Sequence, residues 1–199
     1  MSDQVDLLSI FQAVTGTLSE NQSTLNEADS YNHNHGDNMV NIFNMVTNAL
    51  SEKQDLDTGS QLAYASQMLS QEKSGSAQVY AKGLASAAEQ FQGQNLNAES
   101  VMPLLQSLLG GGEVTSDSQG SLQGMLGNLL GGEDDKLDAG DLLNAGMSFF
   151  SAKGRGKSNQ EALLEAVISS GPMGQSSHRA QSGQMVASTV LDMLGKLGK

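Results

Sequence analysis

A change of sequence pattern that indicates the fold lies within Leu25-Asn-Glu-Ala-Asp-Ser-Tyr-Asn-His-Asn-His-Gly-Asp-Asn-Met-Val-Asn-Ile-Phe-Asn-Met-Val-Thr-Asn-Ala-Leu50. Up to Gly36 the residues are mostly polar and have no regular spacing, which is typical of a loop. After Gly36 apolar residues return at helical spacing, and Asp37 is suited to cap the helix that they define. The pattern predicts a polar loop followed by an amphipathic helix, whose apolar stripe comprises Met39, Val40, Phe43, Val46 and Leu50.

Stripes of the same kind precede and follow this helix. The chain has only two prolines, and helix-favouring residues outnumber β-branched and aromatic ones. Ser158 and Glu161 have the spacing of a capping box, which marks a helix start. We therefore expect an all-α fold, an antiparallel helical barrel or bundle of about eight helices joined by short loops. The other helices are expected at about 3–18, near Leu25, and at 58–70, 76–91, 97–109, 138–152, 158–169 and 182–197.

One segment departs from this composition. Between Gly110 and Gly132, eight of 23 residues are glycine, and Leu-Leu-Gly-Gly occurs at both ends. Such a stretch suits a flexible excursion, here with one small apolar helix at 122–129 that could dock on a partner. We expect a single domain over 1–199 with a Gly-rich insertion at about 110–137.

Composition excludes several classes of function. Without cysteine the chain has no disulfide, zinc-thiolate site or cysteine nucleophile. Its net charge of −12 argues against nucleic acid as a partner, because that binding depends on cationic contacts to phosphates. The N-terminus lacks signal-peptide features and no stretch is long and apolar enough for a membrane span, so a cytoplasmic location is expected. A small phosphorylated ligand stays compatible with this composition.

The loop at 25–39 resembles, without a gap, the signature of the nucleotide-binding subunit of dihydroxyacetone kinases, the DAK2 or DhaL-like domain. In that family a Leu-Asp precedes a Gly-Asp-x-Asp-His-Gly-x-Asn-Met run, and three aspartates hold two Mg²⁺ ions that bridge the nucleotide phosphates. The resemblance places His35, Gly36, Asn38 and Met39 in the retained nucleotide-binding half, and Glu27, Asn32 and Asn34 at the three metal positions.

Two further stretches support the resemblance. Residues 74–81 are similar to the small-residue segment of the family at a helix start, with Ser76 at the phosphate-contacting serine. Residues 173–183 are similar to the stretch before the final helix of the family, where Arg179 is the basic candidate for a phosphate contact. The resemblance covers most of the chain in helix order, except the Gly-rich insertion.

The resemblance implies an eight-helix antiparallel barrel with ADP or ATP and Mg²⁺ at one end. It also implies phosphoryl transfer to a substrate held on a separate partner subunit, with a catalytic contribution from positioning and metal electrostatics. Two amides in place of aspartates remove two formal charges, which weakens binding of hard Mg²⁺ ions. The alternative is therefore a non-catalytic binding or interaction module derived from that fold.

Simpler interpretations accompany these assignments. Residues 32–35 could form a polar loop that bonds to local backbone, and Ser76 could simply cap a helix. His33 and His35 suggest a zinc or nickel site only weakly, because they lie two apart in an irregular loop. The acidic cluster at 133–141 lacks oxygen ligands at EF-hand spacing and is better interpreted as a solvated loop.

Overall fold

The computed structural model describes residues 6–98, 100–110, 151, 155–156 and 158–197. Every regular element within these ranges is helical, which confirms the expected all-α fold class. The helices are α1 (Leu7–Glu20), α2 (Gln22–Ala28), α3 (His35–Glu52), α4 (Thr58–Leu69), α5 (Gly75–Gln90), α6 (Val101–Leu109), α9 (Asn159–Ser170) and α10 (Ser177–Leu197), with a short 3-10 helix η2 at Pro172–Gln175.

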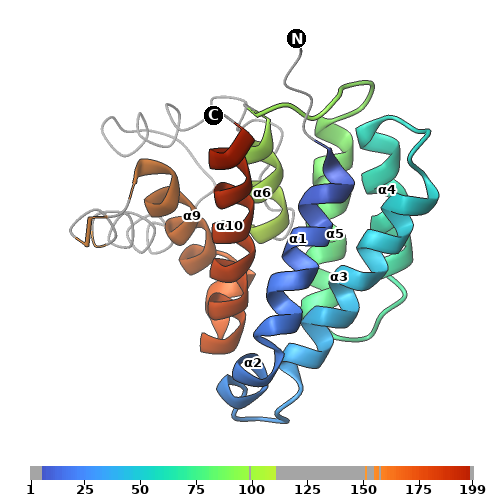
Figure 1. The fold of residues 1–199 in the computed structure, drawn as a ribbon. Helices are drawn as coiled ribbons and strands as arrows, with labels where there is room; N and C mark the ends of the chain where they lie inside the picture. The colour runs from blue at the N-terminus through green and yellow to red at the C-terminus, as the bar shows by residue number, and fades with distance from the viewer. Residues whose placement is uncertain (1–5, 99, 111–150, 152–154, 157, 198–199) are drawn as a thin grey trace, which may run out of the picture.

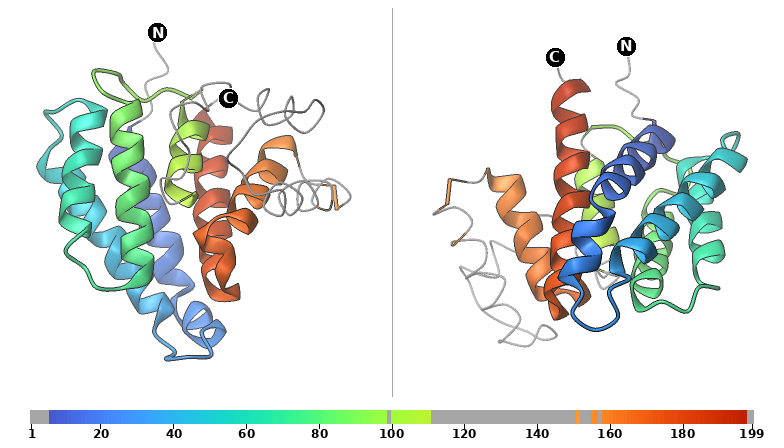
Figure 2. Two further views of the ribbon diagram at one scale, coloured as in Figure 1. Left: turned by 180° about the vertical axis from the view of Figure 1, so that it is seen from behind. Right: turned by 60° about the horizontal axis from the view of Figure 1, so that its bottom comes forward.

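The helices pack as a bundle of mainly antiparallel neighbours (Figure 1). Helices α1 and α4 run down in this view, whereas α3, α5 and α10 run up. Contacts between neighbours close a ring in the order α1, α3, α4, α5, α6, α9, α10 and back to α1. Figure 2 shows α10 lying beside α1, although the two helices are at opposite ends of the chain. The N-termini of α3, α5 and α10 consequently lie at the same end of the bundle.

The centre of the bundle is filled by the apolar stripe of α3 and its neighbours. Phe43 stacks on Phe11 of α1 with ring centroids 5.8 Å apart. It also meets Tyr80 of α5 edge to face at 5.1 Å. Because offset and edge-to-face arrangements suit aromatic quadrupoles, these contacts orient α1 and α5 around α3 as well as burying area.

Capping chemistry corrects two expected helix starts. Asp37 does not cap α3; the helix begins at His35, and Asp37 lies in its first turn. There the carboxylate accepts hydrogen bonds from the side-chain amides of Gln22 at 2.7 Å and Asn26 at 2.9 Å, which draws it toward α2. Helix α5 is capped by Ser74, whose hydroxyl accepts the N–H of Ala77, so Ser76 is inside the first turn.

The C-terminal third shows one confirmed start and one wrong one. Ser158 and Glu161 form the expected capping box at the start of α9. Helix α10 begins at Ser177, five residues before the expected start at 182, because its first turn is polar and carries no apolar stripe. The insertion at about 110–137 and the expected helix at 138–152 lie almost entirely outside the described residues. No helix of the described ranges is long and apolar enough to cross a membrane.

Gly83 marks the closest approach between α5 and α6. A Cβ at this position would lie 2.6 Å from the backbone oxygen of Ser107 and 2.8 Å from the Cα of Leu108. Backbone atoms cannot move aside as a flexible side chain does, so α6 can pack this closely only on a glycine.

We predict that Gly83→Ala lowers the free energy of unfolding by about 1–3 kcal/mol, because α5 and α6 must separate. The matched control is Gly16→Ala in α1, where a Cβ meets nothing within 4 Å. That change should raise stability by about 0.5–1 kcal/mol through helix propensity. Urea unfolding followed by circular dichroism measures both, and an equal effect of the two substitutions would contradict the close packing of α5 on α6.

Candidate functional site

Three segments that carry the resemblance meet at the lower end of the bundle in Figure 1. Each of them begins a helix: His35 begins α3, Gly75 begins α5 and Ser177 begins α10. The guanidinium of Arg179 lies directly over Gly75, since a Cβ there would be only 2.6 Å from its terminal nitrogen. Arg179 therefore joins the first turn of α10 to the first turn of α5.

His35 joins α3 to α10 at the same end. Its side chain is buried, and Nε2 lies 2.9 Å from the hydroxyl oxygen of Ser182. The Ser182 hydroxyl donates its proton to the backbone oxygen of Arg179 at 3.0 Å, so it accepts the hydrogen bond from His35. This requires the Nε2–H tautomer of His35. The imidazole also lies against the ring of His178, with centroids 4.6 Å apart.

The surroundings of His35 favour its neutral form. Burial, followed by the electrostatic effect of His178, lowers the pKa of His35 from its ordinary 6.5 to about 4, and Arg179 acts in the same direction. The carboxylate of Asp29 opposes this shift without cancelling it. At neutral pH His35 is therefore an uncharged hydrogen-bond donor, and the positive charge of Arg179 lies near it.

Asp29 organises the loop between α2 and α3 from inside. Its carboxylate is 4 % exposed and accepts the N–H of Tyr31 at 3.1 Å and that of Asn34 at 3.4 Å. Burial alone would raise the pKa of Asp29, but these N–H groups and His178 outweigh it and hold the pKa below its ordinary value. The carboxylate is thus ionised and turned inward, with Oδ1 3.9 Å from Nδ1 of His178.

The other ring nitrogen of His178 lies near a serine. Its Nε2 lies 3.2 Å from the hydroxyl of Ser176, the residue directly before α10. Ser176, His178 and Asp29 were not among the site residues expected from the sequence. The signal was present, since Asp29 begins the polar loop and His178 lies inside the 173–183 match, but their proximity depends on tertiary packing.

The three expected metal positions do not form a carboxylate-rich site. Glu27 is exposed on α2 and Asn32 is exposed in the loop. The side-chain oxygen of Asn34 accepts a hydrogen bond from Asn38 at 2.8 Å. Among the described residues, no group of three or more His, Cys, Asp or Glu side chains is arranged to hold a metal ion. One exposed carboxylate and two amides do not fit a protein site for two Mg²⁺ ions.

Two further expected site residues have clear structural roles. A Cβ at Gly36 would lie 2.1 Å from the backbone oxygen of Gln22, so this glycine allows α3 to start against α2. Met39 is fully buried in the core.

Ser76 is buried at the second position of α5, beside the residue that Arg179 covers. His33 is exposed with a φ of 54°, whereas His35 is buried, so the two imidazoles have different surroundings.

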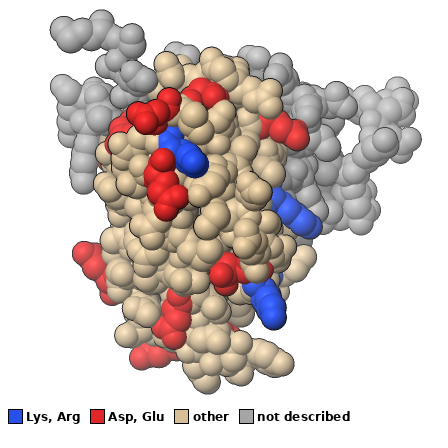
Figure 3. Space-filling view, turned by 90° about the vertical axis from the view of Figure 1, so that its right-hand side faces the viewer, with Lys and Arg blue, Asp and Glu red and all other residues tan. Residues whose placement is uncertain are grey.

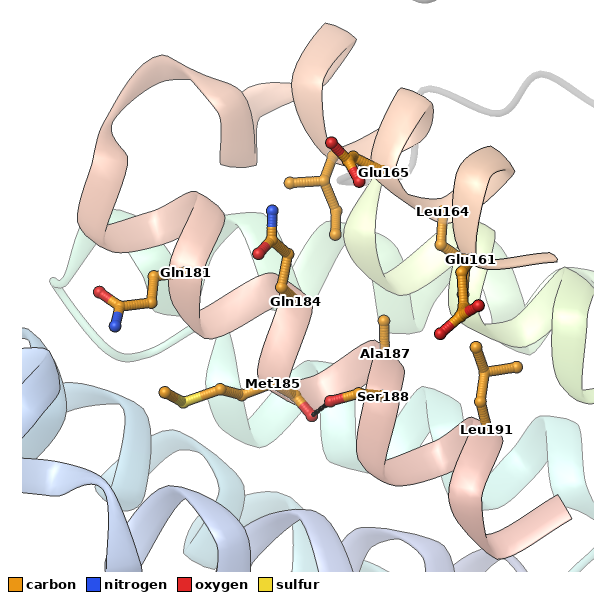
Figure 4. A pocket seen from close by; sticks show the side chains of 10 residues that line it. Glu161, Leu164, Glu165, Gln181, Gln184, Met185, Ala187, Ser188 and Leu191 are labelled. Carbon is orange, nitrogen blue, oxygen red and sulfur yellow. Dashed lines mark hydrogen bonds between the residues drawn. The ribbon is translucent and has the colours of Figure 1, made fainter. Parts of the chain in front are cut away.

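A hollow of about 330 Å³ lies between α9 and α10 (Figure 4). Glu161 and Glu165 border it on α9, Gln184 points toward Glu165 from α10, and Met185 is also among its lining residues. Both glutamates already have partners, because Glu161 belongs to the capping box and Glu165 pairs with Arg155. This acidic and amide lining is unsuited to an anion, which leaves the end with Arg179 as the candidate site.

Comparison with known proteins finds no relative of this chain. No family model, curated protein or solved structure matches the chain.

We predict that the chain loses stability as the pH falls from 6.5 toward 4. The pKa of His35 lies below its ordinary value, so the unfolded chain binds this proton more tightly than the folded chain does. The contribution is complete above pH 6.5 and disappears as the pH approaches about 4. Urea midpoints at several pH values should fall less steeply for His35→Gln than for the unchanged chain. His33→Gln, at an exposed imidazole, should follow the unchanged chain; identical slopes for both variants would contradict a buried neutral His35.

Proposed function

We propose that this protein binds a small phosphorylated ligand, a nucleotide such as ADP or ATP, at the end where α3, α5 and α10 begin. The observation that carries the proposal is the position of Arg179 over Gly75, between the first turns of α10 and α5. A phosphate held there would meet a guanidinium and the N–H groups of two helix starts.

The chemistry of this end suits an anion for two reasons. The first N–H groups of a helix have no acceptor within the helix, and the helix dipole places partial positive charge at the same point. Arginine adds a planar fork of donors that matches phosphate oxygens. With His35 neutral, the positive charge over Gly75 comes from Arg179.

Acidic groups predominate on the molecule, and Asp29 and Asp37 lie at this same end, near the start of α3. The chain has a net charge of −12, and Figure 3 shows acidic side chains outnumbering basic ones on one face of the molecule. A general cationic surface would attract polyanions such as nucleic acid, whereas one arginine at a helix start selects a small phosphate. The resemblance to dihydroxyacetone kinase subunits, which begins at the same loop, supports a nucleotide as the ligand.

We further propose that toward its nucleotide the protein is a binding module without phosphoryl transfer, rather than a working kinase subunit. Asn34 bonds to Asn38, and the amides at positions 32 and 34 replace carboxylates that two-metal phosphoryl transfer requires. In this view Mg²⁺ arrives as the counterion of the nucleotide and is not held by three protein carboxylates. Transfer to a substrate on a partner subunit remains the alternative and predicts turnover with magnesium.

We predict that Arg179→Ala weakens ADP binding by about 10- to 100-fold, because it removes charge-assisted hydrogen bonds worth about 1.5–3 kcal/mol. The control is Arg155→Ala, since Arg155 is the other arginine of the chain and is exposed beside Glu165. Calorimetric titration with ADP and ATP, with and without Mg²⁺, provides the measurement. Failure of the unchanged chain to bind either nucleotide at millimolar concentration would overturn the proposal, as would equal losses in both arginine variants.

A second prediction separates the binding module from the kinase subunit. The double variant Asn32→Asp and Asn34→Asp restores the two missing charges, and Asp at position 34 still accepts the hydrogen bond from Asn38. Nucleotide affinity in Mg²⁺ should rise in this variant, while affinity without Mg²⁺ should fall through charge repulsion. An unchanged chain that already hydrolyses or transfers the terminal phosphate in Mg²⁺ would contradict the proposal of binding without phosphoryl transfer.

A further inference from the structure

Ser176, His178 and Asp29 lie in the order of a hydrolytic relay. The Ser176 hydroxyl is 3.2 Å from Nε2 of His178, and Nδ1 of the same ring is 3.9 Å from Oδ1 of Asp29. The relay is recognised by this geometry and by the role of each group, and it occurs on unrelated folds. We propose that Ser176 is an activated nucleophile that hydrolyses small carboxylic esters bearing a negative charge.

The environment supports each role. Asp29 is 4 % exposed and is fixed by the N–H groups of Tyr31 and Asn34. It can therefore orient the imidazole of His178 through Nδ1. Its distance to His178 is within ion-pair range, and a shift of about 1 Å brings the pair into hydrogen-bond range. The side chain of His178 is 21 % exposed and that of Ser176 is half-buried, so a small substrate can reach both.

The reaction balances with water as the only other reactant. The Ser176 oxygen attacks the ester carbonyl carbon and its proton moves to Nε2 of His178. The bond to the alcohol breaks, and the alcohol leaves with that proton. Water then attacks the acyl-serine, gives a proton to His178 and releases the acid, and His178 returns the proton to Ser176. The first N–H groups of α10 lie next to the nucleophile and can stabilise the oxyanion.

The preference for a negative charge comes from Arg179, three residues after the nucleophile and next to Gly75. The inference shares this arginine with phosphate binding and is otherwise independent of it. A chain that binds no nucleotide can still acylate Ser176, and a chain that binds nucleotide can fail to do so.

The first test treats the full chain with a fluorophosphonate probe. An activated serine forms a P–O bond, the P–F bond breaks, fluoride leaves and the serine proton passes to the base. Mass spectrometry should find one adduct, on Ser176. Labelling should be lost in Ser176→Ala, slowed about 100-fold in His178→Ala, and unchanged in the control Ser188→Ala, which removes an exposed serine of α10.

The second test compares hydrolysis of mono-4-nitrophenyl succinate with that of neutral 4-nitrophenyl acetate. The anionic ester should be preferred about 10-fold or more, and Arg179→Ala should remove that preference. The inference is overturned if no adduct forms, if labelling spreads over several serines or falls on His178, or if His178→Ala labels at the unchanged rate. Circular dichroism spectra confirm that each variant keeps its helices.

Discussion

The hydrogen bond between His35 and Ser182 is the constraint on which the functional end of this protein depends. The two residues are 147 positions apart, yet the contact places the first turn of the last helix against the start of α3. The same Ser182 hydroxyl makes a second hydrogen bond, which it donates to the carbonyl of Arg179. This bond holds the backbone from which the guanidinium extends. The position of Arg179 over Gly75 is therefore set largely by a buried, uncharged histidine.

The loop between α2 and α3 holds the other half of this contact. Asp29 turns the loop by accepting N–H groups from Tyr31 and Asn34, and Gly36 lets α3 start in contact with the backbone of α2. Asp37 then ties the first turn of α3 to two amides of α2. These interactions hold His35 in place.

Most of the fold could be predicted from the sequence, because apolar stripes such as Met39 to Leu50 and the Ser158 capping box are local signals. The starts of the helices were harder to predict from the sequence. Asp37 was expected to cap α3, but its carboxylate instead bonds to Gln22 and Asn26, and the polar first turn of α10 has no stripe to reveal it.

The candidate site divides in the same way. The resemblance predicted His35, Ser76 and Arg179 as site residues from their order along the chain. The proximity of Asp29, His178 and Ser176 could not be predicted, since it arises only when α10 packs against the loop that follows α2. Both functions proposed for this end depend on that tertiary contact. Phosphate binding uses Arg179, and ester hydrolysis uses His178, which lies between Ser176 and Asp29.

Backbone amide NMR during titration with ADP shows where a phosphate contacts the chain. If the ligand binds where α3, α5 and α10 begin, the largest shift changes will cluster at residues 35–38, 75–78 and 177–180, and pyrophosphate will reproduce those at 75–78 and 177–180. Shift changes that cluster instead along the hollow between α9 and α10, or that spread evenly over the bundle, would contradict binding at this end.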